Sequence, residues 1–198
     1  ENYAGAAANA ALESLTLLKN ESPQGQPVLP ILGAGKVFVS GPTSNSLNAL
    51  NGGWTGTWQG TDTAFNTKGQ PTMVEAMQMR FGSERVKHMD LGMEFTGDEI
   101  QRVVRSIQRQ QPSHIVLGLG EMPYTEIVGN IDDIALFENQ KDLVRAVHAL
   151  GIPVVGVFIE GRPRAFDDIE PLLDAIVMGY IPGDYGADAI AQVLDGSH

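Results

Sequence analysis

The sequence contains no cysteine, which excludes disulfide bonds, thiolate nucleophiles and cysteine-ligated zinc. It has no run of eighteen apolar residues, so we expect neither a transmembrane helix nor a membrane partner. No basic segment is followed by an apolar stretch, so the sequence as given shows no signal peptide. The histidines are too scattered for metal-ligand spacing, and we expect no metal site. They are His88, His114, His148 and His198.

Positive charge is also scarce. Lys and Arg total 13 against 24 for Asp and Glu, which gives a formal net charge of −11. Nucleic acids and anionic membranes attract basic surfaces, so neither is an expected partner. The charge balance suits a protein that acts on neutral substrates.

What the sequence does contain is an alternation of helix-like and strand-like segments. Apolar residues at steps of three and four indicate amphipathic helices, and short apolar runs indicate buried strands. Capping boxes at Thr72-x-x-Glu75 and Thr96-x-x-Glu99 mark two helix starts. We predict helices over residues 3–19, 72–82, 96–111, 138–150 and 186–194. Strands are predicted over residues 36–41, 114–119, 153–159 and 175–179, with a weaker one over 85–89.

The pattern of these strands indicates the fold class. They are continuous apolar runs, which is typical of parallel strands covered on both faces. We therefore predict the α/β class: a three-layer α/β/α sandwich with a mostly parallel, doubly wound sheet. The length suits one domain with a sizeable core, over residues 1–198.

Two of the predicted connections are long. Residues 41–71 and 120–137 each follow a parallel strand, so both should project from the same edge of the sheet. Ligands bind beyond the carboxyl ends of strands in such sheets, where connections are usually much shorter. Long loops there are usually functional or disordered, and we expect function.

Both tryptophans lie in the first loop, in the run GGWTGTWQG over residues 52–60. The flat faces of Trp54 and Trp58 suit the C–H face of a sugar ring, and glycines let the backbone approach a ligand closely. Alternatively, an indole fills the domain's own core. For this pair we expect about one of the two to do so.

The second loop opens with GEMPYTE over residues 120–126 and holds two carboxylates and a tyrosine. A carboxyl group near apolar surface has a raised pKa and can act as a general acid, and glycoside hydrolysis uses two carboxyl groups across the bond. Alternatively, one of Glu121 and Glu126 binds loop backbone and the other is solvated. Asp132 and Asp133 fit a solvated loop or a helix start.

These runs carry a family resemblance. GGWTGTWQG, GEMPYTEIVGN and Gly161-Arg162-Pro163 resemble the second, C-terminal domain of family 3 glycoside hydrolases, the β-glucosidases and exo-β-glucanases. Further pieces agree in the same order over essentially the whole chain. They are ESLTLLKN at residues 13–20, Gly41-Pro42-Thr43 and Pro182-Gly183.

The resemblance implies an α/β sandwich beside a TIM-like barrel, with the active site between them and the aspartate nucleophile on the barrel. In many members the second domain supplies an acid/base glutamate and an aromatic sugar platform, which match Glu126 and Trp58 here. Trp54 and Tyr124 complete the candidate substrate-binding set, although Trp54, like Glu121, also fits a supporting role. The implied substrate is a β-linked gluco-oligosaccharide or glucoside, with no metal or organic cofactor.

The sequence holds no barrel pattern and no segment like the nucleophile motif. We therefore expect a domain excised from a longer enzyme, inactive alone, with the N-terminal barrel of the same parent chain as its partner. The resemblance favours a periplasmic or secreted location. Two other classes stay open: a non-catalytic carbohydrate-binding or interface module, and a doubly wound anion- or nucleotide-binding domain. The negative charge and the incomplete glycine fingerprint at Gly118-Leu119-Gly120 disfavour the last.

Overall fold

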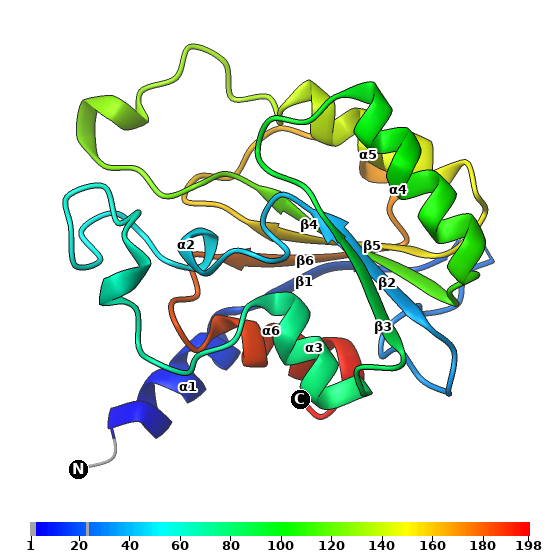
Figure 1. The fold of residues 1–198 in the computed structure, drawn as a ribbon, viewed down its shortest axis with the longest axis horizontal. Coiled ribbons are helices and arrows are strands. Elements are labelled where there is room, and N and C mark those ends of the chain that lie inside the picture. Colours follow the sequence, from blue (N-terminus) through cyan, green and yellow to red (C-terminus); the bar gives the residue numbers. More distant parts are fainter. Residues whose placement is uncertain (1–2, 23) are drawn as a thin grey trace.

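The computed structural model describes residues 3–22 and 24–198. Over these residues a six-stranded sheet has the order β1-β6-β5-β4-β2-β3. All neighbouring strands are parallel except β1, which runs antiparallel to β6. The predicted α/β sandwich with a mostly parallel, doubly wound sheet is confirmed (Figure 1). The strands are β1 (Thr16–Asn20), β2 (Val37–Gly41), β3 (Val86–Asp90), β4 (His114–Gly120), β5 (Val154–Ile159) and β6 (Ala175–Tyr180).

Helices cover both faces of the sheet. On one face lie α1 (Tyr3–Ser14), α3 (Met73–Phe81) and α6 (Gly186–Asp195), and on the other lie α4 (Gly97–Gln110) and α5 (Glu138–His148) (Figure 1). Successive strand residues serve opposite cores, because their side chains alternate across the sheet. Val157 packs in the core beneath α3 and α6, and Phe158 packs in the core beneath α4 and α5. Both cores are built from side chains of this chain.

The two predicted capping boxes are confirmed. The Thr72 hydroxyl accepts from the Glu75 amide at the start of α3, and Thr96 and Glu99 repeat the arrangement at the start of α4. In each box the glutamate carboxylate accepts from the threonine amide in return. Each box satisfies two amides that the first helical turn leaves without partners.

The predicted helix over residues 3–19 is correct through Ser14 and wrong over residues 15–19. Helix α1 ends at Ser14, and Thr16–Asn20 forms strand β1 along the edge of β6. The Ser14 hydroxyl donates to the carbonyl of Ala11, a local bond that competes with helix continuation. Pairing with β6 satisfies backbone groups along an otherwise open edge, and this tertiary gain overrides the helical spacing.

The order of the five parallel strands creates a switch point between β2 and β4. The connection from β2 to β3 passes over one face through α3, and the connection from β4 to β5 passes over the other through α5. A crevice forms where neighbouring strands send their connections to opposite faces. Residues 42–72, called here the β2 loop, and residues 121–137, the β4 loop, leave the sheet at this point.

Candidate active site

The two long loops contact each other directly. The Thr125 amide donates to Gln59 Oε1 at 3.0 Å, and Gln59 Nε2 donates to Thr125 Oγ1 at 2.7 Å. The Thr125 hydroxyl donates in turn to the carbonyl oxygen of Trp58 at 3.1 Å. Because Trp58 and Glu126 are bonded neighbours of Gln59 and Thr125, these contacts bring the predicted aromatic and acidic residues to one rim.

Gly53 permits this close approach. A Cβ atom at this position would overlap the Thr125 methyl group and lie 2.7 Å from the carbonyl oxygen of Tyr124. Any larger residue would therefore push the loops apart. This is a specific reason for one glycine of the GGWTGTWQG run.

The β2 loop is anchored on its other side by Asp184, in the connection from β6 to α6. Asp184 accepts from the Asn51 side chain at 3.0 Å and from the Thr67 amide at 2.7 Å. Although partial burial opposes it, these hydrogen bonds lower the pKa of Asp184. The loop also contains two short helices that the sequence did not predict, α2 (Leu47–Leu50) and η1 (Thr63–Phe65). They give it internal structure.

Both indoles are exposed, so the expectation that one fills the core is wrong. Trp54 is 66% exposed and Trp58 is 48% exposed. Trp54 has a φ of 68°, a left-handed conformation that costs energy for a residue with a side chain. The loop therefore places two large apolar faces in contact with solvent.

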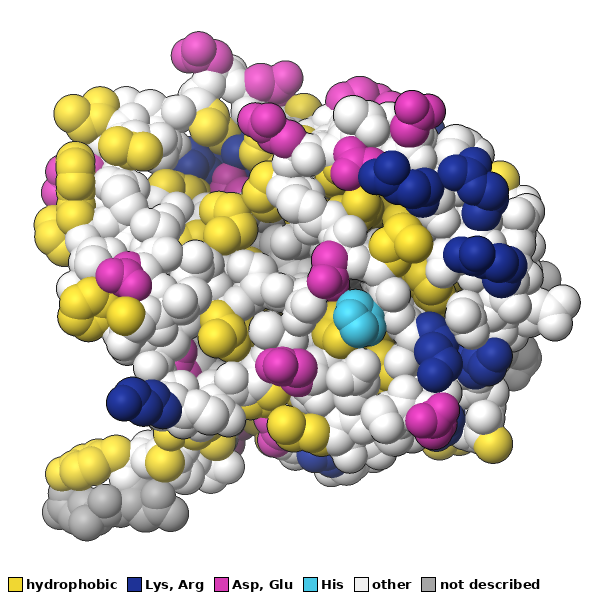
Figure 2. Space-filling model, in the orientation of Figure 1, with side chains coloured by type: hydrophobic (Ala, Val, Ile, Leu, Met, Phe, Trp, Pro, Cys, Tyr) yellow, Lys and Arg dark blue, Asp and Glu magenta, His cyan; other side chains and the backbone are white. Residues whose placement is uncertain are grey.

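Glu126 is exposed and begins the short helix η2 (Glu126–Gly129). Its φ of 51° is also left-handed. Exposed Ile127 and Val128 follow it, and with Trp54, Trp58 and Phe65 they form what we call the rim patch. Figure 2 shows hydrophobic side chains gathered at the left of the molecule, where Figure 1 places these loops.

Glu121 lies in a different environment from Glu126. Its side chain is 5% exposed, and its carboxylate accepts from Arg162 Nε at 3.2 Å and from Arg164 Nη2 at 2.7 Å. The carboxylate therefore bridges two arginines of the loop that follows β5. Glu121 braces the fold, whereas Glu126 faces solvent.

The Tyr124 ring lies between Gly129 of its own loop and the guanidinium of Arg162. The guanidinium carbon of Arg162 lies 3.9 Å from the centre of its ring, a cation–π contact. A Cβ atom on Gly129 would overlap the same ring. Burial, and then the negative charge of Glu121, raises the pKa of the Tyr124 hydroxyl. One face of this predicted substrate-binding residue is therefore already covered by protein.

Glu160, directly after β5, is a second buried carboxyl group in this region. It is 2% exposed, and its Oε1 accepts from the Arg164 amide at 3.1 Å, while its Oε2 has no hydrogen-bond partner among the described residues. Burial raises the pKa of Glu160 to about 7, against the opposing hydrogen bond from the Arg164 amide and with a further contribution from the charge of Glu121. The sequence predicted no role for this residue.

Other features of the described residues bear on the chemistry. No three His, Cys, Asp or Glu side chains in residues 3–22 and 24–198 are grouped as metal ligands would be. No helix within that same part of the chain is long and apolar enough to cross a bilayer.

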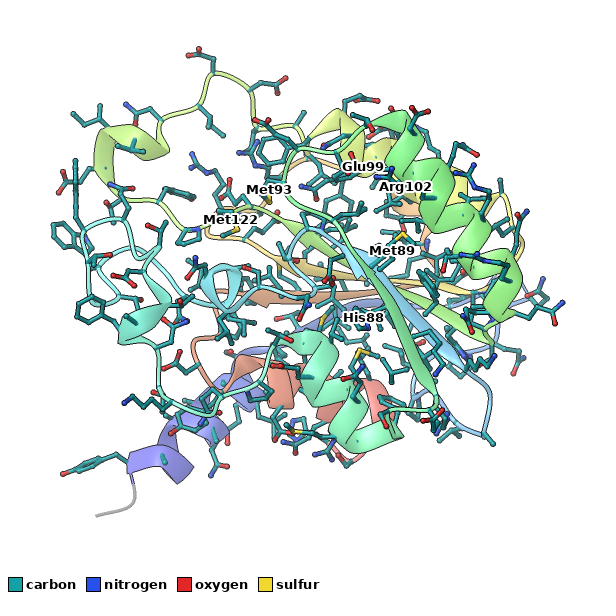
Figure 3. All side chains as sticks on the ribbon, viewed as in Figure 1. His88, Met89, Met93, Glu99, Arg102 and Met122 are labelled. Atoms are coloured by element: carbon teal, nitrogen blue, oxygen red, sulfur yellow. The ribbon has the colours of Figure 1, made fainter. Side chains whose placement is uncertain are left out.

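Met122, labelled in Figure 3 at the root of the β4 loop, packs against the core beneath α3 and α6. The loop is therefore anchored where it leaves the sheet.

Several residues that build this region were not singled out by the sequence. Gln59 and Thr125 form the contact between the loops, Asp184 anchors the β2 loop, and Arg164 pairs with Glu121. Thr125 lies inside the recognised PYTE run and Gln59 inside GGWTGTWQG, so both could have been selected with their motifs. Asp184 and Arg164 gave no local signal, because their partners are distant in sequence.

Comparison with known proteins gives concordant matches. A family model described as "Glycosyl hydrolase family 3 C-terminal domain" matches residues 15–198. A lysosomal beta glucosidase of Dictyostelium discoideum is 30% identical over 201 residues, covering 97% of this chain and 24% of that protein. A periplasmic beta-glucosidase of Salmonella typhimurium is 25% identical, covering 95% of this chain and 26% of that protein.

Solved structures agree. A beta-glucosidase from Listeria innocua, in complex with isofagomine, superposes with a TM-score of 0.81 at 26% identity, covering 98% of this chain and 25% of that chain. The present chain therefore spans about a quarter of the length of the relatives it matches.

Proposed function

This chain belongs to the glycosyl hydrolase family 3 C-terminal domain family, and from this premise we propose that it forms one wall of the active site of a retaining β-glucosidase-type enzyme. Its relatives are beta-glucosidases about four times as long. The remaining length of these relatives has room for a barrel domain that carries the nucleophile. The rim patch is the surface that this barrel and a β-linked glucoside or gluco-oligosaccharide would contact.

The observation that carries the proposal is the contact of Thr125 with Trp58 and Gln59. It fixes the loop of Trp58 against the loop of Glu126 while both side chains stay exposed. An acid that must reach a glycosidic oxygen, and a flat apolar face that must reach a sugar ring, both have to project from the domain. Family resemblance and geometry thus support the same two residues.

In the proposed mechanism, Glu126 in its protonated form gives its proton to the leaving oxygen. The C–O bond breaks as an aspartate of the barrel attacks the anomeric carbon and forms a glycosyl–enzyme ester. Glu126, now ionised, then takes a proton from water, which attacks the same carbon and releases the aspartate. Glu126 is exposed in this chain, so the barrel and the bound sugar would supply the enclosure that an acid requires. Trp58 would stack on the sugar, with Trp54 and Tyr124 lining the same wall.

The test is Glu126→Gln in the protein that contains this chain and the barrel, with Asp132→Asn, an exposed carboxylate of the same loop, as the matched control. Poor leaving groups need protonation, so their kcat/KM should fall by about 10²–10⁴. Aryl β-glucosides with good leaving groups should lose much less, because they leave without a proton. An equal loss on both substrate types would remove Glu126 from the acid role.

A second candidate is a carbohydrate-binding or interface module whose acid lies elsewhere. The exposure of both indoles favours it, since sugar stacking alone needs no carboxyl group. In that case Glu126→Gln would leave all rates unchanged, and only the effects of Trp58 substitution would remain.

A further inference from the structure

A chain of polar contacts connects the end of β5 to the loop that bears Glu126. The Glu160 carboxylate accepts from the Arg164 amide, and the Arg164 side chain binds Glu121 through Nε at 3.0 Å and Nη2 at 2.7 Å. Glu121 also binds Arg162, whose guanidinium covers the Tyr124 ring. Tyr124 lies two residues from Glu126. We call Glu121, Arg162, Arg164 and Tyr124 the brace.

The Glu121–Arg164 pair of the brace is buried, and the Arg164 donors are already used by Glu121 and by backbone, so the pair offers little stabilisation to a second negative charge. Glu121 and Arg164 are 5% and 6% exposed at their side chains, and Arg164 also donates through Nη1 to the Ala135 carbonyl at 3.0 Å. Glu160 is equally buried and leaves one carboxylate oxygen without a partner. A buried ionised carboxylate with an unsatisfied oxygen is costly, and two such charges around one arginine repel each other. When Glu160 is protonated and neutral, Glu121 is the only carboxylate of the two that attracts Arg162 and Arg164.

We propose that Glu121 is a positioning residue for the loop of Glu126, acting through Arg162 and Tyr124, and that the proton on Glu160 keeps this brace assembled. When Glu160 ionises, its charge competes with Glu121 for Arg164. Water entry or a shift of Glu121 relieves the repulsion, and either change loosens Arg162 and the Tyr124 ring. The inference rests on the proposed function only for the role of Glu126, since the attachment of the loop is a property of this chain.

Burial raises the pKa of the Glu160 carboxyl to about 7. The groups that act on it are Glu121 after β4 and Arg164 in its own loop. Arg162 binds Glu121 in turn, and its guanidinium lies over the Tyr124 ring. Strand β6 contributes the carbonyl oxygen of Tyr180, which accepts from the Glu160 amide at 2.9 Å. No histidine among the described residues hydrogen-bonds or forms an ion pair with the brace.

The first experiment follows the loop by NMR in the 198-residue chain. The probes are the Thr125 amide, the Gln59 side-chain amide and the indole N–H groups of the two tryptophans, from about pH 5 to about pH 9, outside the range of unperturbed carboxylates. In the wild type these signals should shift together with a midpoint at about 7. Glu160→Gln, which mimics the protonated acid, should abolish the transition. Glu94→Gln removes an exposed carboxylate that has no ion pair or side-chain hydrogen bond with any described residue, and this variant should keep the transition.

The second experiment tests the positioning role of Glu121 independently of the protonation of Glu160. Below pH 7, where the wild-type brace is assembled, Glu121→Gln should raise hydrogen exchange of the Thr125 amide by about tenfold, because Arg162 loses its charged acceptor. Should Glu121→Gln fail to fold, Arg162→Gln removes the more exposed arginine, keeps the buried Glu121–Arg164 pair and should have the same effect. A wild-type loop that shows no transition, a transition that survives Glu160→Gln, or unchanged exchange in the folded brace variant would overturn the proposal. None of these readouts depends on hydrolysis, so each can fail while the acid role of Glu126 stands.

Discussion

Thr125 shows how much of this site depends on a single side chain. Its amide and hydroxyl make three hydrogen bonds to Gln59 and Trp58, across 66 and 67 positions of sequence. The motif predicted that Trp58 and Glu126 act together, yet nothing local to either motif indicates the atoms that join them. Residue types and their order predicted the chemistry. The pairing comes from the sheet, which brings the ends of β2 and β4 side by side.

The stacking role of Trp58 predicts a substrate-dependent effect. In the barrel-containing protein, Trp58→Ala should lower kcat/KM for a β-linked disaccharide by about tenfold or more, since an aromatic contact contributes about 1.5 kcal/mol. A methyl glucoside, which has no second sugar to stack, should lose little. Trp58→Phe keeps a flat face and is the matched control. Equal losses on both substrates would argue for a structural role.

At the scale of elements, the sequence was informative where local chemistry decides the outcome. The capping boxes located α3 and α4, and apolar runs located the central strands. It failed at residues 16–20, where helical spacing of leucines was overridden by pairing with β6. It also missed α2 and η1, because four- and three-residue helices are too short to show a period. The two failures have different causes: a strand distant in sequence decides residues 16–20, whereas α2 and η1 are local structures too short to leave a pattern.

The ordered conformation of the β2 loop should depend on Asp184. Asp184→Asn retains only one acceptor oxygen for the two donors, Asn51 and Thr67, so hydrogen exchange should rise across residues 51–67 and stay unchanged in α3 and β4. In the wild type the anchor is present above the ordinary aspartate pKa of 3.8 and is lost as the pH falls through the lowered pKa of the folded state. Exchange rates read by mass spectrometry at neutral pH test the variant. Uniform protection of the loop in the variant would contradict the anchor.

At the scale of the whole molecule, the titration of Glu160 should appear in stability. Its pKa rises from 4.5 in the unfolded chain to about 7 in the fold. Between these values the native state holds a proton that the unfolded state has released, so stability contributed by this group is full below 4.5 and lost as the pH rises to 7. The loss is on the order of 3 kcal/mol.

Urea unfolding between these pH values measures this contribution. Glu160→Gln should remove the corresponding slope and be more stable than the wild type at neutral pH, whereas Glu94→Gln should keep the slope. A variant that retains the wild-type slope would show that other groups cause it.

In the proposed function, the domain as a whole presents one wall of a site rather than a closed pocket. The sequence predicted this arrangement through family resemblance, and the exposed rim patch agrees with it. The most direct test is a crystal structure of the barrel-containing protein with a bound analogue of a β-linked disaccharide. We predict a Glu126 carboxyl about 5–5.5 Å from an aspartate carboxyl of the barrel, the spacing of retaining glycosidases, with the face of Trp58 on the sugar. A structure in which Glu126 points away from the sugar, or in which Trp58 and Glu126 contact different clefts, would contradict the account.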